Sequence, residues 1–316
     1  MLEDFLDSVQ QSIFADYDGK KQGYLRVPET QYNLPFTLIK GASSGKNLLI
    51  TAGIHSCEYV SIEAALRLSR QLKPSLVHGS VLILPIMNIS GFQSRQTTVV
   101  PEDMKNLNRV FSGDPKGSNS EKIAAFLSGG IFPHIDFYAD LHCVCQFEEL
   151  VPHLYFYGDK AQNSSAEASK YINVPFAVRS SSTNSACGCA ANLGIPSLLI
   201  ERGGNGIWSE SQVSDMLSDI YNLMRYLGIL DGEAKLFSPK ELTGCKFIDD
   251  FPAGLWYPEK SSGSYFKKGE SLGFIRDAFG GVIKNYIAPY DGAVLYQTAS
   301  LWADSFCDLI AFGKTD

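Results

Sequence analysis

The sequence lacks any apolar run that approaches the roughly 20 residues a membrane-spanning helix needs. Its first ten residues, MLEDFLDSVQ, carry acidic side chains where a secretory signal has a basic segment followed by an apolar one. Basic residues are in the minority, with 27 Lys and Arg against 34 Asp and Glu and a net charge of -7. Nucleic acids and anionic membranes favour basic protein surfaces, so we expect neither as a partner. We expect a cytoplasmic protein.

Cysteine is also scarce. The seven cysteines form an odd set at no regular spacing, which favours free thiols in a reducing interior over a disulfide framework. Two Cys-x-Cys pairs occur, Cys143 with Cys145 and Cys187 with Cys189. A thiolate metal site or a redox switch is one interpretation of these pairs, and inert packing is the favoured one.

The 316 residues have an ordinary globular balance, with 45% hydrophobic and 19% charged residues. In the first two-thirds, short apolar runs alternate with helical patterns, which is typical of an α/β fold. Strands with nearly continuous apolar character, as in sheets buried on both faces, are expected over 47–52, 80–86, 135–140 and 197–200.

Helices are expected between these strands. Over 58–72, apolar residues recur at every fourth position, which predicts a helix with one buried face. Ser118 with Glu121 and Ser209 with Gln212 have the spacing of helix-capping pairs and predict the starts of two more helices.

After about residue 231 the helical patterns end, and short strands alternate with turns. We therefore expect a catalytic domain over 1–230 and a small all-β domain over 231–316. The segments KKGESLGFI and APYDGAV are similar to the hairpins of lipoyl and biotinyl carriers, in a barrel-sandwich arrangement. Carriers commonly place the modified lysine between two methionines, and no Met-Lys-Met occurs here. We interpret this region as a lid, a pocket wall or a contact between copies in a homo-oligomer.

Only five histidines occur, and two of them follow predicted strands. His55 comes after one strand with Glu58 three residues later, and His142 ends another strand. Glu201 directly follows a third strand, and two glycines, Gly203 and Gly204, come after one intervening residue. Ligands of open α/β sheets lie outside the carboxyl ends of the strands, where these side chains are expected. Two histidines and a carboxylate form a hydrolytic zinc site that keeps one position open for water.

A further motif, Asn106-Leu107-Asn108-Arg109, is followed by Gly113-Asp114-Pro115. A guanidinium grips a carboxylate with two parallel hydrogen bonds, and an asparagine adds a neutral donor. A structural loop is the alternative interpretation of this motif.

These motifs together resemble the succinylglutamate desuccinylase/aspartoacylase family, within the zinc carboxypeptidase-like hydrolases. The resemblance rests on TAGIHSCEYVSIEA, NLNRVFSGDPKGSNSEKIAAFL, DLH and IERGGNGIWSE, and it extends into the C-terminal region. It implies a mixed-sheet α/β catalytic domain and a deacylase that cleaves the amide bond of a small N-acyl amino acid.

The resemblance also implies roles for individual residues. His55, Glu58 and His142 are implied as Zn²⁺ ligands, Glu201 as the general base that acts on the metal-activated water, and Asn108 and Arg109 as binders of the substrate carboxylate. The alternative function is a zinc carboxypeptidase that acts on short peptides with the same metal site.

Three departures from the family pattern put the substrate in doubt more than the reaction. Ser56-Cys57 stands where the family usually has glycine between the first ligands. Thr97-Thr98 stands where an arginine followed by an aromatic residue is common, and the segment 184–189 has no substrate-binding arginine. Arg202 is a candidate substrate contact, with pairing at the surface or at a sheet edge as the alternative.

Overall fold

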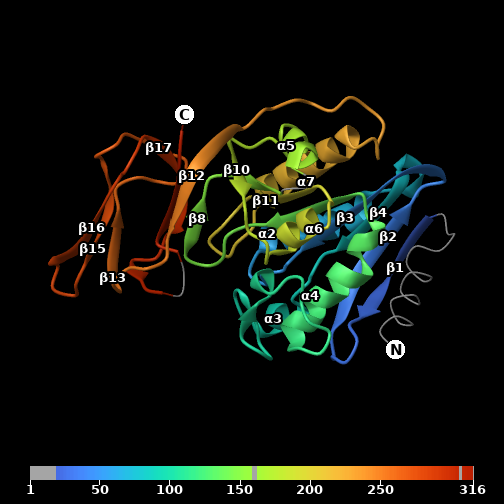
Figure 1. Ribbon diagram of the computed structural model, residues 1–316, viewed down its shortest axis with the longest axis horizontal. Helices are drawn as coiled ribbons and strands as arrows, with labels where there is room; N and C mark the ends of the chain where they lie inside the picture. Colours follow the sequence, from blue (N-terminus) through green and yellow to red (C-terminus); the bar gives the residue numbers. More distant parts are fainter. Residues whose placement is uncertain (1–18, 159–161, 306–307, 316) are drawn as a thin grey trace.

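The computed structural model describes residues 19–158, 162–305 and 308–315, so the acidic N-terminal segment discussed above lies outside the described residues. A large mixed sheet crosses the molecule, helices cover its two faces, and a smaller antiparallel region follows at the C-terminal end (Figure 1). None of the helices in the described ranges combines the length and the apolar character that crossing a membrane requires.

The large sheet of the described chain holds 13 strands. Twelve of them follow one path, in the order β1 (Gly19–Arg26), β2 (Asn33–Lys40), β4 (His78–Leu84), β3 (Ser43–Ala52), β7 (Phe137–His142), β11 (Ser197–Glu201), β9 (His153–Tyr157), β10 (Phe176–Ser180), β12 (Lys240–Ile248), β19 (Ile310–Lys314), β17 (Gly292–Thr298) and β14 (Tyr265–Phe266). The thirteenth strand, β8 (Glu148–Leu150), pairs with β17.

The centre of this sheet is parallel, because β4, β3, β7 and β11 all run in the same direction. Antiparallel pairs on either side, β2 with β4 and β9 with β11, make the sheet mixed. These four central strands contain or overlap the four predicted from the apolar runs. Their side chains are buried on both faces, which explains why the runs are nearly continuous rather than alternating.

Two hydrophobic cores lie on the two faces of the sheet. One core packs α2 (Tyr59–Gln71), α7 (Glu210–Tyr226) and α5 (Gln162–Ser169) against it. The other packs α4 (Asn119–Gly130), α6 (Ala186–Asn192) and α3 (Ile89–Ser94) on the opposite face. The predicted caps are present: Ser118 and Glu121 form a capping box on α4, and the Ser209 side chain accepts from the backbone N–H of Gln212 at α7.

The C-terminal region is all-β in the described residues after β12. A four-stranded antiparallel sheet joins β16 (Val282–Ile287), β15 (Ser271–Arg276), β13 (Gly254–Pro258) and β18 (Trp302–Ala303). This region is not simply appended, because β12 pairs in parallel with β10 and carries the large sheet onward into β19 and β17. The C-terminal strands therefore stand at a fixed position beside the catalytic part (Figure 1).

Candidate active site

Three neighbouring strands deliver the candidate residues to one edge of the sheet. The ladder between β3 and β7 ends at the pair Ala52 and Leu141, so the loop that carries His55 lies beside the strand end at His142. The ladder between β7 and β11 pairs His142 with Glu201. Because parallel strands present their carboxyl ends at the same edge, residues far apart in the sequence meet here.

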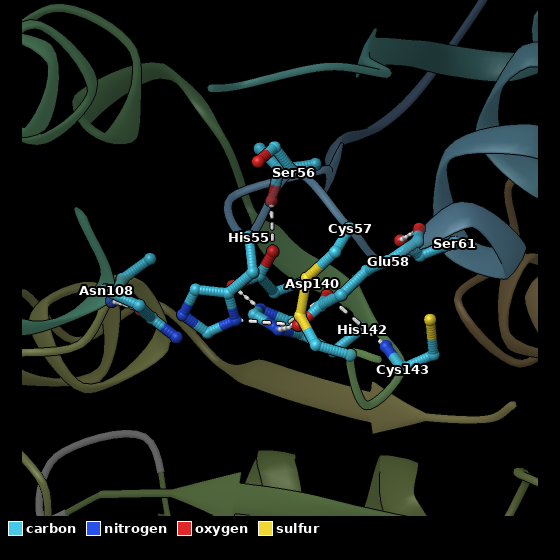
Figure 2. Close-up of polar contacts among 12 residues, drawn as sticks. His55, Ser56, Cys57, Glu58, Ser61, Asn108, Asp140, His142 and Cys143 are labelled. Carbon is cyan, nitrogen blue, oxygen red and sulfur yellow. Dashed lines mark hydrogen bonds and ion pairs between the residues drawn. A yellow bond between two sulfur atoms is a disulfide. The ribbon is translucent and has the colours of Figure 1, made fainter. Parts of the chain in front are cut away.

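His55, Glu58 and His142 converge on one point (Figure 2). One donor atom from each residue lies within 4.8 Å of the other two. Nδ1 of His55 is 2.6 Å from Oε1 of Glu58, and Nδ1 of His142 is 3.1 Å from Oε2 of the same carboxylate. Glu58 and His142 are buried, and the His55 side chain is 13% exposed. The carboxylate thus lies between the two imidazoles.

The far nitrogen of each imidazole is held by a second residue. Nε2 of His142 lies 3.0 Å from Oδ2 of the buried Asp140, and Nε2 of His55 lies 3.1 Å from Oδ1 of Asn106. Both acceptors lack a proton to give, so each Nε2 donates to its acceptor. Each Nδ1 faces Glu58, where it can donate a proton to the carboxylate or, once deprotonated, offer its lone pair to a metal. Two such nitrogens and one carboxylate oxygen are the donor set of a catalytic zinc site with one open position. The residues present therefore fit the metal.

Burial opposes ionisation of Glu58, but the nearby charges of His142 and His55 outweigh it and hold the pKa of this carboxyl below its usual value. Burial also opposes the charged form of His142, but the carboxylates of Glu58 and Asp140 raise the pKa of the imidazole well above its usual value. Glu58 and His142 therefore stabilise each other's charges where burial would otherwise oppose them.

Glu201 lies at the end of β11 beside this cluster. Its Oε2 is buried and has no hydrogen-bond partner among the described residues. Burial raises the pKa of Glu201 to about 8, His142 opposes the shift, and the carboxylates of Glu58 and Glu148 add to it. A carboxyl group that exchanges its proton near neutral pH suits general acid–base work.

The turn after Glu201 depends on glycine. Gly203 has a φ of +95°, and a Cβ there would lie 2.5 Å from Cγ2 of Val60, which is on α2. The chain therefore turns sharply between β11 and the helix that follows Glu58, and this close approach holds Glu201 next to the ligands.

One cavity of about 540 Å³ contains all six residues singled out from the sequence. Asn108 is buried, and its Oδ1 accepts from the backbone N–H of Ala186 at 2.9 Å. Arg109 is exposed, and its Nη1 donates to the backbone oxygen of Asn108 at 3.0 Å. Both residues lie on the short helix η2 (Leu107–Arg109), which places them on the wall of the cavity that the three candidate metal ligands also line.

Comparisons with known proteins agree with this geometry. The catalytic-domain model of succinylglutamate desuccinylase/aspartoacylase matches residues 44–227, more than half of the chain. The chain belongs to the succinylglutamate desuccinylase/aspartoacylase family. The match includes all the candidate metal and catalytic residues, so the membership predicted from the four motifs is confirmed.

Individual relatives extend the comparison. The chain is 28% identical over 241 residues to the N-alpha-acetyl-L-2,4-diaminobutyric acid deacetylase of Halomonas elongata, covering 72% of this chain and 70% of that protein. The succinylglutamate desuccinylase/aspartoacylase of Rhodobacter sphaeroides superposes with a TM-score of 0.84 at 25% identity, over 95% of this chain and 97% of that one. The product-bound ectoine utilization protein EutE (DoeB) of Ruegeria pomeroyi gives 0.85 at 25% identity, over the same shares.

This family membership places the chain among hydrolases of the deacylase class. The expected fold is also confirmed, because the mixed sheet and the smaller all-β C-terminal region superpose on structures of the family over nearly the whole chain.

Arg202 has a structural partner. Its guanidinium is buried and lies 2.7 Å from Asp219 on α7, with a further hydrogen bond to the backbone oxygen of Asn173. It does not line the cavity, although Glu201 precedes it directly. Neither a substrate contact nor pairing at the surface or a sheet edge describes this arginine, because its ion pair with Asp219 is buried inside the fold.

The expectation of free thiols is wrong for two of the cysteines. Cys57 and Cys145 form a disulfide with a Cα–Cα distance of 5.3 Å, across 88 positions of sequence. The cause is the adjacency of β3 and β7, which brings the loops after both strands together. Cys143, Cys187 and Cys189 are free and buried, as the packing interpretation predicts.

Several residues of the site went unrecognised in the sequence. Asn106 was visible in the motif with Asn108, but its contact with His55 spans 51 positions and no local pattern signals it. Glu148 gave no signal because isolated glutamates are common. The C-terminal region supplies one wall of the cavity, as the pocket-wall interpretation of this region predicts. The wall is formed by Phe247, Asp249, Tyr296, Ser305 and Asp308.

Proposed function

We propose that this protein is a zinc-dependent deacylase that hydrolyses the amide bond of a small N-acyl amino acid. One observation carries the proposal: the three metal donors and the unpartnered Oε2 of Glu201 share one cavity at the edge of the sheet. The deacetylase of Halomonas elongata supports the reaction class, because its name gives an N-acetyl amino acid as substrate.

His55, Glu58 and His142 would hold the zinc. The chemistry that a bound zinc supplies is the acidification of a water and the polarisation of the acyl carbonyl. Glu201 then accepts the proton of the attacking water and returns it to the nitrogen of the leaving amine. Its raised pKa serves both halves of this cycle, because the carboxyl group can hold the proton between the two transfers.

Asn108 and Arg109 would orient the substrate by its α-carboxylate. Asn108 is fixed by its bond to the backbone of Ala186, whereas the guanidinium of Arg109 reaches the same cavity from the exposed side. A guanidinium that binds the carboxylate with two parallel hydrogen bonds fixes the orientation of the substrate. The acyl carbon is then held in a defined position for attack.

We further propose that the amino acid carries a cationic side chain. Glu148 and Asp308 line the cavity, and neither forms an ion pair with a lysine or arginine in the part of the chain that the structure describes. Burial raises the pKa of Glu148 to about 7, and repulsion from the carboxylates of Asp308 and Glu58 adds to the shift. An ammonium group would relieve this repulsion. The substrate named for the Halomonas elongata relative, an acetylated diaminobutyric acid, carries such a group.

A carboxypeptidase acting on short peptides is the alternative. Tyr296 and Asp308 come from the C-terminal region and stand on the cavity wall with Glu148. A wall contributed by this region restricts how far a substrate extends beyond the cleaved bond, which favours a small acyl group over a peptide chain. A cytoplasmic location and the formation of homo-oligomers stay predictions.

The purified protein should contain about one zinc per chain, measured by atomic emission. It should hydrolyse members of a panel of N-acetyl amino acids, N-succinyl amino acids and dipeptides, with amine release measured as the product. Preference for the acetylated amino acids over dipeptides supports the deacylase, and the reverse preference supports the carboxypeptidase.

Glu201→Gln provides the matched control. The amide keeps the size of the side chain but cannot accept the proton, so kcat should fall by about 10²–10⁴-fold while the zinc content stays at the wild-type level. Normal turnover by this variant would show that Glu201 is not the general base.

A further inference from the structure

The disulfide between Cys57 and Cys145 connects the two chain segments that carry the candidate metal ligands. Cys57 directly precedes Glu58, and Cys145 follows His142 by three residues. Figure 2 shows the sulfur atoms beside Glu58, between the loop of His55 and the strand end at His142. The bond therefore joins the two segments that supply all three metal donors.

Beyond the end of the β-ladder, the polar contacts between these two segments are non-covalent and centre on Glu58, whose Oε2 lies 3.1 Å from Nδ1 of His142. The ladder between β3 and β7 stops at Ala52 and Leu141. Past that point the backbone N–H of Cys143 donates to Oε2 of Glu58 at 3.3 Å, a long bond. Ser56 is anchored elsewhere, since its backbone N–H and its hydroxyl donate to Thr97 and Gln96. The disulfide is the covalent tie between the two loops.

The Cys145 end of the disulfide also borders the cavity. The backbone N–H of Cys145 donates to Oε2 of Glu148 at 3.2 Å, and Cys145 lines the cavity. The position of Cys145 therefore affects both the metal donors and the acidic wall. Among the described cysteines the other four are free, so this is the one place where the fold uses a disulfide.

We propose that Cys57 and Cys145 are positioning residues of the metal centre, and that opening their disulfide with a dithiol weakens metal binding. The inference rests on the metal site of the proposed function. A metal site gains affinity when its donors are held near their final geometry, and this crosslink limits how far Glu58 and His142 can separate.

The redox step needs a dithiol as electron donor. One thiolate of the dithiol attacks the sulfur of Cys145, which lines the cavity, and the sulfur of Cys57 leaves as a thiolate. The second thiolate of the dithiol then displaces Cys145, so the reductant becomes a disulfide. Two electrons pass to the protein, and its two sulfurs take up protons to end as thiols.

Both half-cystines are at least nineteen-twentieths buried, with exposed fractions of 2% for Cys57 and 5% for Cys145. The reductant must therefore enter through the substrate cavity. A product amino acid bound in the cavity should slow the reduction, which separates this route from opening by global unfolding.

The first experiment is a peptide map of the purified protein without reductant, which should recover the Cys57 and Cys145 peptides joined. The second compares Zn²⁺ affinity, by competition with a chromophoric chelator, between the wild type and Cys57→Ser/Cys145→Ser. The double variant should bind about 10–100-fold more weakly, the range seen when residues that orient metal ligands are removed. Its Co²⁺ absorption spectrum should also change, since the donors lose their fixed geometry.

Cys245→Ser is the matched control, because Cys245 is a half-buried free cysteine on β12 outside the site. Its metal affinity should equal that of the wild type. Reduced dithiothreitol, removed before measurement, should weaken metal binding by the wild type but not by the double variant. This treatment also tests the proposal if the double variant does not fold.

Excess Zn²⁺ should restore hydrolysis by the double variant, because the catalytic groups remain. Free thiols at both positions in the peptide map would overturn the inference, as would equal metal affinity with and without the bond. If the bond changes metal affinity but the wild type hydrolyses nothing in the panel, only the proposed function fails. If hydrolysis is normal and metal affinity is independent of the bond, only the present inference fails.

Discussion

His142 and Asp140 form a pair that is buried on one strand, with Nε2 of the imidazole 3.0 Å from Oδ2 of the carboxylate. Residues two apart on a strand point to the same face, so β7 itself sets this pairing. Asp140 also accepts a hydrogen bond from Thr51 on the neighbouring strand β3. The carboxylate therefore fixes the ring of His142 from behind and directs Nδ1 toward Glu58.

Asp140→Asn should weaken Zn²⁺ binding by about 10–100-fold, because the amide keeps the shape but loses the charge that supports the imidazole as a ligand. Chelator competition measures the affinity. Asp136→Asn is the control: Asp136 is an exposed carboxylate one residue before the start of β7, and its variant should bind zinc normally. Unchanged zinc affinity in Asp140→Asn would mean that Asp140 has only a structural role within the sheet.

Glu148→Gln should raise KM for an N-acetylated amino acid with an amine side chain by about 10–100-fold, the value of a hydrogen bond to a charged group. KM for a neutral substrate of similar size should stay the same. In the wild type, KM for the amine substrate should fall as pH rises through about 7, because Glu148 gains its negative charge there. Equal effects on both substrates would contradict recognition of a cation.

His153→Phe should reduce the pH dependence of stability. His153 is fully buried among Tyr155 and Tyr296, and burial lowers the pKa of its imidazole to about 4. In the unfolded chain the pKa is about 6.5, so the unfolded state binds the extra proton between these values and the folded state loses stability as pH falls.

From pH 7.5 to pH 5 this single group should cost the wild type about 2 kcal/mol of unfolding free energy. Urea unfolding at the two pH values, on metal-free protein, measures the difference, and His153→Phe should lack this part of it. The same pH dependence in both proteins would assign the acid sensitivity to other groups.

Asp219→Ala should lower the unfolding free energy by about 3–5 kcal/mol, since it removes the buried carboxylate 2.7 Å from the guanidinium of Arg202 and leaves only the exposed Asp215 at 3.6 Å. Urea unfolding measures the loss. The folded variant should keep the KM of the wild type, because neither side chain lines the cavity. A large change in KM with little loss of stability would instead place Arg202 in substrate binding.

Much of the local structure could be predicted from the sequence. The apolar runs that became β3, β4, β7 and β11 are long and nearly continuous, and the capping pairs at Ser118 and Ser209 have partners three residues away. Such signals lie within one element, so no knowledge of the neighbours is required. The paired strands β9 and β10 and the helix α6 were not predicted, because their short segments carry no clear periodicity.

The candidate site could also be predicted, because His55, His142 and Glu201 each stand at or just past the end of a recognisable strand. Their partners could not. Asn106 reaches His55 across 51 positions, and Cys145 reaches Cys57 across 88. Each of these contacts depends on loops that meet only after β3, β7 and β11 have become neighbours.

The sequence by itself determined which segments become strands and helices and which residues can bind a metal, because periodicity and side-chain chemistry are local properties. Only the tertiary structure decided that Cys57 and Cys145 are bonded, and that the C-terminal region supplies the wall with Asp308. The physical reason is the order of strands in the sheet. That order follows from how the helices pack across its two faces, which no single segment encodes.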